Sequence, residues 1–352
     1  MIIYWIWLSH LKYVCPVLQK KLLDHFRTSK AVYDATEEEL LIIPRISKKA
    51  IQSIQSSRSL KEAEALLKST RKAGVDMLTF DDKHYPHFAS EYKESPILLF
   101  YKGNLQPLET TVGVVGARRC TAYGKRTAEK IGEELADLNI PLISGFAKGI
   151  DSYAQASCVK NNGYTIGFLG NGPDICYPQE QEQLSKKILN SCGAFISQYP
   201  PGTPPNPRFF PARNALISAW STELVIVEAG EKSGALMTAD FAKKNNRRIL
   251  AVPNQIDVQE GAGTNYLLSR GIPPYLGIQS LISANGKIKT SLPSKTTSSN
   301  SPILQTLSES PKTIIQLIQQ LKLEKSELID LLMDLELDQK IILRGNMVYL
   351  LK

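Results

Sequence analysis

Short apolar runs alternate with amphipathic segments through the middle of the chain. The amphipathic segments, such as residues 123–138 and 234–246, have the composition of surface helices. Strands that are apolar throughout, separated by helices of about 10–15 residues, are typical of a parallel sheet covered on both faces. The runs predict strands at residues 112–116, 140–144, 164–170, 193–197, 223–229 and 247–253, with added edge strands at 75–80 and 96–103. We therefore expect an α/β fold, with a doubly wound, mostly parallel, Rossmann-like sheet over residues 75–283.

The first 74 residues have a different pattern, with helical periodicity throughout. Residues 59–74 place apolar side chains on one helix face and end at Gly74, a common helix C-cap. Residues 41–54 have the outline of a helix-hairpin-helix, whose turn amides bind DNA phosphate. We expect an N-terminal helical domain that is SAM-like or helix-hairpin-helix-like. Arg45 and Ser47 stand where glycines would allow close approach, and a plain helical turn in a small bundle is an equal alternative.

The end of the chain separates into a polar segment and a small domain. Residues 284–301 are rich in Ser, Thr, Lys and Asn, and they predict a linker because they cannot bury enough apolar surface to order themselves. Residues 302–352 show three helices and then two short strands around Gly345, which predicts a winged-helix domain. The third helix, residues 325–338, is acidic and would repel a phosphate backbone. This favours a protein-contact or regulatory role over binding of duplex DNA.

Net charge and cysteine content give limited information about the partners of the protein and its redox compartment. The 352 residues carry a net charge of +8, which favours polyanionic partners. Five cysteines without a Cys-x-x-Cys pair indicate a reduced, cytoplasmic protein.

The apolar start of the chain is too short to span a bilayer, so no membrane association is expected. His84 and His87 have no cluster of further ligands beside them, and we predict no metal and no cofactor.

Glycine-bearing loops follow four of the predicted strands, at the sheet edge where open α/β folds bind ligands. Their amides, hydroxyls and helix N-termini suit phosphate, and nearby cations add charge. The chain has no Walker A motif and no dinucleotide fingerprint, which argues against ATP hydrolysis by the P-loop route. Four such loops exceed what one mononucleotide requires, and they predict a track for the successive phosphates of a polymer. The candidates are Arg118 and Arg119 in the first loop, Ser144, Gly145, Lys148 and Gly149 in the second, and Ser233, Gly234 and Thr238 in the fourth, while Asp151 is expected to cap a helix.

Residues 197–220 form the most distinctive stretch, in which prolines stiffen an exposed loop that interleaves cations with aromatic residues. Aromatic rings that stack on bases, with arginines on the intervening phosphates, are how proteins grip single strands. One of Phe209 and Phe210 is expected to fill the core beneath the loop. The candidate binding residues of this stretch are Arg208, Phe210, Arg213 and Asn214.

At these residues the sequence resembles the DprA/Smf family, the DNA-processing proteins of natural transformation. The matching stretches lie in order across residues 75–283 and include "VGVVGARRCTAYGKR", "ISGFAKGIDSYAQ", "SQYPPGTPP", "FPARNALIS" and "VEAGEKSGALMTADFA". The resemblance implies a sequence-independent single-stranded DNA-binding protein that protects incoming DNA in competence and recombination. It implies loading of the RecA recombinase onto DNA held by single-strand binding protein. It also implies a homodimer through the region near Tyr266, Leu267 and Leu276.

The resemblance also carries residue roles onto this chain. The family's phosphate-contacting arginine falls on Arg118, its glycine turn on residues 144–149, and its lysine on Lys148. Its aromatic residue falls on Phe210, and its Arg-Asn pair falls on Arg213 and Asn214. Two positions depart from the family pattern, because Ala117 stands where serine is usual and Ala215 where arginine is usual. Both departures predict a weaker grip on phosphate, which Arg119 offsets.

An enzyme on the same fold is the alternative function. Nucleotide phosphoribohydrolases of this fold use a double-glycine loop followed by a glutamate. The corresponding stretch here, "AGEKSGALMTAD", has no double glycine and offers Thr238 or Ala239 where the glutamate would lie. Since the general acid/base is missing, we favour a protein without catalytic activity.

Overall fold

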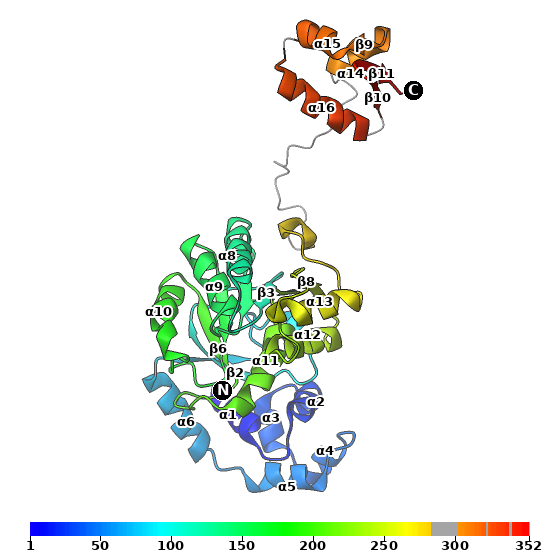
Figure 1. Cartoon of the computed structure of the whole chain (residues 1–352). Helices are drawn as coiled ribbons and strands as arrows, with labels where there is room; N and C mark the ends of the chain where they lie inside the picture. Colours follow the sequence, from blue (N-terminus) through cyan, green and yellow to red (C-terminus); the bar gives the residue numbers. More distant parts are fainter. Residues whose placement is uncertain (283–301, 322, 338–339, 352) are drawn as a thin grey trace. The chain divides into compact units, whose positions relative to one another are not determined.

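The computed structural model describes residues 1–282, 302–321, 323–337 and 340–351. The chain divides into two compact units, Met1–Lys287 and Ile288–Lys352, which are described separately (Figure 1). The linker predicted over residues 284–301 lies outside the described residues.

An eight-stranded sheet in the order β1-β2-β6-β5-β4-β3-β7-β8 forms the centre of the first unit. Neighbouring strands from β3 to β8 pair in parallel, whereas β1, β2 and β6 pair antiparallel at one edge. The strands are β1 (Asp76–Thr79), β2 (Leu98–Gly103), β3 (Val112–Val115), β4 (Leu142–Ser144), β5 (Thr165–Phe168), β6 (Ala194–Ser197), β7 (Glu223–Ile226) and β8 (Arg248–Ala251). The predicted mostly parallel α/β fold is therefore confirmed, together with its added edge strands.

Helices cover both faces of this sheet. Figure 1 shows α8, α9 and α10 on one side and α11, α12 and α13 on the other, which is the doubly wound arrangement. The helices are α7 (His87–Ser90), α8 (Ala122–Asp137), α9 (Ile150–Lys160), α10 (Glu182–Asn190), α11 (Phe210–Ala219), α12 (Gly234–Lys244) and α13 (Ala262–Ser269), with 3₁₀ turns η1 (Gln179–Gln181), η2 (Pro207–Phe209), η3 (Gln259–Gly261) and η4 (Ile278–Ser280). Between the layers, the fully buried Phe168 and Trp220 pack edge to face with ring centroids 5.4 Å apart. Burial of each such ring contributes on the order of 1.5–3 kcal/mol.

The N-terminal residues are helical, as predicted, and they pack against the edge of the sheet. The helices are α1 (Ile2–His10), α2 (Pro16–Phe26), α3 (Ser29–Asp34), α4 (Glu37–Leu41), α5 (Lys48–Ser56) and α6 (Lys61–Lys72). The apolar start of the chain is explained by α1, in which Trp5, Ile6, Trp7 and Leu8 are all buried. Within the described residues, no helix has the length and apolar character needed to cross a bilayer.

The turn between α4 and α5 has the geometry of a helical hairpin but not its usual residues. Arg45 has φ +62°, in the left-handed region that favours glycine. Ser47 caps α5, because its hydroxyl accepts a hydrogen bond from the amide of Ala50 at 3.2 Å. A side chain therefore projects from the turn at a position where a phosphate-binding hairpin ordinarily has only backbone.

The second unit is a small helical domain with its own antiparallel sheet. Its elements are α14 (Pro302–Glu309), β9 (Lys312–Thr313), α15 (Ile314–Leu321), α16 (Lys325–Leu337), β10 (Ile341–Arg344) and β11 (Met347–Leu350). The strand order is β10-β11-β9, and the core includes Leu307, Leu317 and Leu332. Three helices followed by a β-hairpin are consistent with the predicted winged helix.

Candidate functional site

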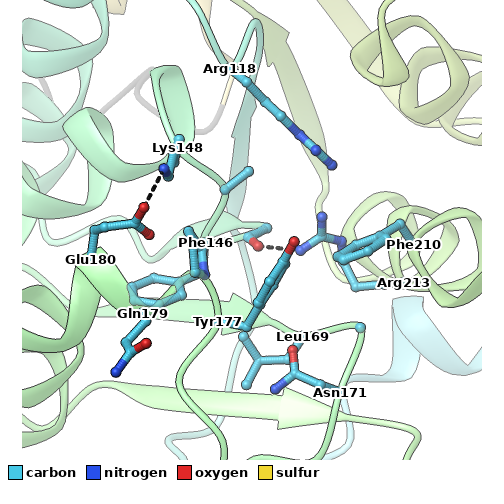
Figure 2. A pocket seen from close by; sticks show the side chains of 14 residues that line it. Arg118, Phe146, Lys148, Leu169, Asn171, Tyr177, Gln179, Glu180, Phe210 and Arg213 are labelled. Carbon is cyan, nitrogen blue, oxygen red and sulfur yellow. Dashed lines mark hydrogen bonds and ion pairs between the residues drawn. The ribbon is translucent and has the colours of Figure 1, made fainter. Parts of the chain in front are cut away.

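The loops after β3, β4 and β5 surround a cavity of about 710 Å³ at the carboxyl edge of the sheet (Figure 2). Residues from the start of α11 and from η1 complete its lining. Figure 2 shows side chains from these separate segments converging on one space. Its most informative lining residues are Arg118, Lys148, Tyr177, Glu180, Phe210 and Arg213. The predicted convergence of glycine loops is therefore present.

A second cavity, of about 260 Å³, adjoins the first and shares Arg118, Ala147 and Arg213 with it. It lies beside β3 and β7, where the strand order reverses, and open α/β sheets bind ligands at such points. The further predicted residues that line it are Asn214, Ser233, Gly234 and Thr238. Four predicted residues, namely Arg119, Ser144, Gly149 and Arg208, are not among the lining of either cavity.

The loop after β3 is held in place by a buried carboxylate. Glu228, which is fully buried after β7, accepts hydrogen bonds from the amide of Thr121 at 2.9 Å and from its hydroxyl. The same Thr121 hydroxyl caps α8 by accepting from the amide of Gly124 at 3.1 Å. The loop is therefore fixed at its far end, while the side chains of Arg118 and Arg119 are exposed.

In the loop after β4, the amides of Gly145 and Ala147 already bond within the protein and are not open to an external anion, contrary to prediction. Gly149, the N-cap residue of α9, has φ +84°, so the chain turns sharply there. The buried carboxylate of Asp151 then accepts from the amides of Gly145 at 3.0 Å and Ala147 at 3.5 Å. Burial raises the pKa of Asp151, against the opposing effect of Arg213. The expectation that Asp151 caps its own helix is also wrong, since it binds the loop before that helix.

The sequence predicts that Ser144 and Thr238 donate their hydroxyls to phosphate, but both side chains are buried. Ser144 is fully buried, and its Oγ donates to the carbonyl of Val114 at 2.7 Å. Thr238 is also buried, and its Oγ1 donates to the carbonyl of Gly234 at 3.3 Å. Ser233 caps α12 by accepting from the amide of Ala235 at 3.2 Å. Each of these three hydroxyls therefore bonds to the protein's own backbone.

Arg213 is a buried cation rather than the exposed one that the sequence predicts. Its Nη1 donates to the carbonyls of Gly145 and of Phe168, the latter at 2.9 Å, and its Nε donates to Asn214 at 3.0 Å. Burial lowers the pKa of Arg213 to about 10, although Asp151 opposes this effect. Because a guanidinium has five donors, Arg213 satisfies these carbonyls and still lines both cavities.

Two guanidinium groups lie near the ring of Phe210, which lines the larger cavity. The Cζ atoms of Arg118 and Arg213 lie 5.6 and 5.4 Å from its ring centroid, within the range of cation–π contact. The neighbouring Phe209 instead stacks on Tyr199, with centroids 4.0 Å apart. Both phenylalanines are half-buried on the surface loop, so the expectation that one of them fills the core is wrong.

Lys148 is exposed, as predicted, but it has a partner within the protein. Its Nζ lies 2.7 Å from Oε1 of Glu180, which is also exposed (Figure 2). The hydrogen bond from Lys148 lowers the pKa of Glu180. A carboxylate of the chain therefore occupies the position that a phosphate would take against this cation.

Sequence reasoning missed several residues of the site. Tyr177 is 42% exposed and lines the larger cavity, with its ring 6.0 Å from that of Phe210. Asn171 is buried, and its Nδ2 shapes the loop by donating to the carbonyls of Gly172 and Ile175. An aromatic residue inside a glycine loop at a strand end was a usable signal for Tyr177. No local signal distinguishes Glu180 from other surface acids.

The two cavities bring cationic side chains and aromatic rings together. Across the part of the chain that the structure describes, no group of three or more His, Cys, Asp or Glu residues is placed to hold a metal ion. The cavities instead combine cations with exposed ring faces. Cations bind phosphate oxygens and ring faces stack on bases, so the site matches a nucleotide polymer.

Comparison with known proteins agrees with this geometry. The DNA recombination-mediator protein A family matches residues 76–285. Protein Smf of Synechocystis sp. is 36% identical over 290 residues, which cover 81% of this chain and 73% of that protein. DNA processing protein DprA of Streptococcus pneumoniae is 37% identical over 191 residues, covering 54% of this chain and 67% of that protein.

Two solved structures share the fold. DprA from Streptococcus pneumoniae superposes with a TM-score of 0.67 at 26% identity and covers 80% of this chain and 95% of its own. DNA processing protein A from Helicobacter pylori, studied for its single-stranded DNA binding mode, superposes with a TM-score of 0.53 at 27% identity and covers 59% of this chain and 94% of its own. With a family match across most of the first unit and relatives above 30% identity, the chain belongs to the DNA recombination-mediator protein A family.

Proposed function

We propose that this protein binds single-stranded DNA without sequence preference, at the two adjoining cavities, and that it processes DNA in natural transformation. The observation that carries the proposal is the Phe210 ring of the larger cavity within cation–π distance of Arg118 and Arg213, the two arginines that line both cavities. A ring beside cations can offer a face on which a base stacks, while the cations bind the neighbouring phosphates. Support also comes from the Helicobacter pylori structure, which is described for its single-stranded DNA binding mode.

The proposal includes delivery of the bound strand to the RecA recombinase, protection of incoming DNA, and exchange with single-strand binding protein. It further includes a homodimer formed through α13 and the segment after it. In support, Tyr266 is 60% exposed and Leu276 is 68% exposed, while Leu267 is half-buried. Large apolar side chains exposed together are typical of a protein contact surface.

We propose that the site has no catalytic activity. The positions that replace the glutamate of phosphoribohydrolases, Thr238 and Ala239, are both buried and carry no carboxylate. The nearby acid, Asp151, already accepts two backbone amides. Incubation of the protein with AMP should release no free adenine, and robust turnover would refute this part of the proposal.

The direct test compares single-stranded and duplex oligonucleotides by fluorescence anisotropy over a range of salt concentrations. We expect tighter binding of oligo-dT than of a duplex of equal length. The logarithm of affinity should fall linearly with the logarithm of salt concentration, by about 0.7 for each phosphate contacted on a single strand. Equal affinity for both DNA forms would contradict the proposed role of ring stacking.

A further inference from the structure

A second polar groove, of about 570 Å³, lies on the N-terminal helices, among α1, α5 and α6. Its floor includes Trp7 and Leu11, which are buried. Its rim carries two exposed lysines, an exposed tyrosine and several serines, namely Lys12, Lys49, Tyr13, Ser53, Ser56 and Ser59. None of these residues belongs to the two cavities of the sheet.

The N-terminal residues, whose helices form this groove, carry most of the net positive charge of the chain. Residues 1–74 contain thirteen lysines and arginines against seven aspartates and glutamates, so they supply six of the eight net positive charges. The groove itself is lined by Lys12 and Lys49 against one acid, Glu62. Such a concentration attracts polyanions over a distance of about a Debye length, near 10 Å at 0.1 M salt.

Tyr13 is held in an unusual position at the rim of this groove. Its side chain is 67% exposed, and its φ of +65° lies in the left-handed region that bulky residues rarely adopt. The Nζ of Lys49 lies 5.8 Å from the ring centroid. Backbone strain of this kind is often retained for function. At the sheet, the half-buried ring of Phe210 lies at a similar distance, 5.6 Å, from the guanidinium carbon of Arg118.

We propose that this groove is a second binding site for single-stranded nucleic acid. A base stacks on Tyr13, Lys12 and Lys49 contact the flanking phosphates, and the serine hydroxyls donate to phosphate oxygens. A single strand is favoured over a duplex because only unpaired bases can offer a face to the ring. It is favoured over an acidic peptide because a carboxylate chain would leave the exposed ring unused. The assignment of single-stranded nucleic acid as the ligand of this groove rests on the proposed function. The groove itself is independent of the site at the sheet, since the two share no residue.

The first test is photo-crosslinking of the full chain to oligo-dT that carries 5-iododeoxyuridine, followed by mass-spectrometric mapping of the crosslinked peptides. We expect a crosslink at Tyr13 in addition to any at the sheet. The crosslink should persist in an Arg118→Ala variant, because that substitution lies outside the groove. Absence of a crosslink on the peptide that contains Tyr13 would overturn the proposal.

The second test measures oligo-dT affinity in the Arg118→Ala background. Tyr13→Asn removes the ring and keeps a residue that tolerates the left-handed conformation, and Lys49→Gln removes the cation. Each should weaken the remaining binding by about five-fold or more, as expected for the loss of one stacked base or one phosphate contact. The matched control is Lys68→Gln, an exposed lysine of α6 outside the groove lining, which should change the affinity little.

The outcomes separate this proposal from the proposed function. If Arg118→Ala leaves oligo-dT affinity unchanged while Tyr13→Asn weakens it, the groove is supported and the sheet site fails. If Tyr13→Asn and Lys49→Gln behave like the control, the groove proposal fails whatever happens at the sheet. If Lys49→Gln weakens binding but Tyr13→Asn does not, and poly-glutamate competes as well as oligo-dT of equal charge, the groove binds acidic peptides and the nucleic-acid assignment is wrong.

Discussion

Asp151 and Arg213 hold one residue, Gly145, from its two sides. The carboxylate of Asp151 accepts from the Gly145 amide at 3.0 Å, and the guanidinium of Arg213 donates to the Gly145 carbonyl. Both side chains are buried, and each charge favours the ionised form of the other. The conformation of the loop after β4 is therefore fixed by Asp151 and Arg213 in the absence of a ligand.

Replacement of Arg213 should destabilise the fold as well as the site. Arg213→Met leaves Asp151 buried without its cation, a change that typically costs about 3–5 kcal/mol. Urea denaturation should show this loss in the free energy of unfolding. Arg208→Met, at an exposed arginine of η2, serves as the control and should leave stability unchanged. An unchanged midpoint for Arg213→Met would mean that the pair does not hold the loop.

Arg118 should make a phosphate contact that its neighbour does not. Arg118 lines both cavities, whereas Arg119 lines neither. Arg118→Ala should weaken oligo-dT binding and reduce the slope of log affinity against log salt by about 0.7, which corresponds to one phosphate on a single strand. Arg119→Ala is the matched control, and the same anisotropy titrations should give a smaller change. A larger effect at Arg119 would place the DNA outside these cavities.

Phe210 should contribute through stacking rather than charge. Phe210→Ala should weaken oligo-dT binding by about 1–3 kcal/mol with little change in the salt slope. Phe209, whose ring already stacks on Tyr199, provides the control variant Phe209→Ala. A fall in the slope for Phe210→Ala, measured in the same titrations, would show that the lost contact is ionic.

Glu180 should compete with DNA for Lys148. The two groups form an exposed ion pair at 2.7 Å, which contributes little to stability. Glu180→Gln removes a negative charge beside the cavity and frees Lys148, so oligo-dT affinity at low salt should rise by about two-fold to five-fold. The control is Glu182→Gln, since Glu182 forms a similar exposed pair with Lys186. Weaker binding by Glu180→Gln would mean that this carboxylate itself contacts the ligand.

Lys20 should make stability depend on pH. Its Nζ donates to the carbonyls of Ser90 at 3.0 Å and Tyr92 at 2.6 Å, which joins α2 to the segment before β2. Burial lowers the pKa of Lys20 to about 8. As pH rises above 8, the folded state loses this proton while the unfolded chain keeps it, so the free energy of unfolding rises with pH.

The useful window for this measurement is pH 8 to 9. Burial raises the pKa of Cys158 to about 12, which lowers stability once unfolded thiols ionise above about pH 9. Urea midpoints measured across the window should rise for the wild type and for Lys21→Met, a control at the adjacent exposed lysine. They should stay level for Lys20→Met. A rise that persists in Lys20→Met would assign the effect to another group.

Local patterns were enough to predict most of the fold. The parallel strands appear in the sequence as mainly apolar runs, such as residues 112–116 and 224–227, because both of their faces are buried. The carboxyl ends of these strands necessarily meet at one edge. The presence of Arg118 and Phe210 beside a common cavity could therefore be predicted from their positions after or between strands.

The partners of the polar side chains could not be predicted in this way. Arg213 donates a hydrogen bond to Gly145, which is 68 residues away in the sequence, and Lys148 donates one to Glu180, which is 32 residues away. Nothing local distinguishes Ser144, which bonds inward to Val114, from a serine that faces a ligand. Hydrophobic periodicity specifies which face of an element is buried. The hydrogen-bond partner of a buried polar group depends on which other segments pack within about 3 Å of it. For the same reason, only the tertiary structure determines which cationic side chains are already paired with acidic side chains of the protein.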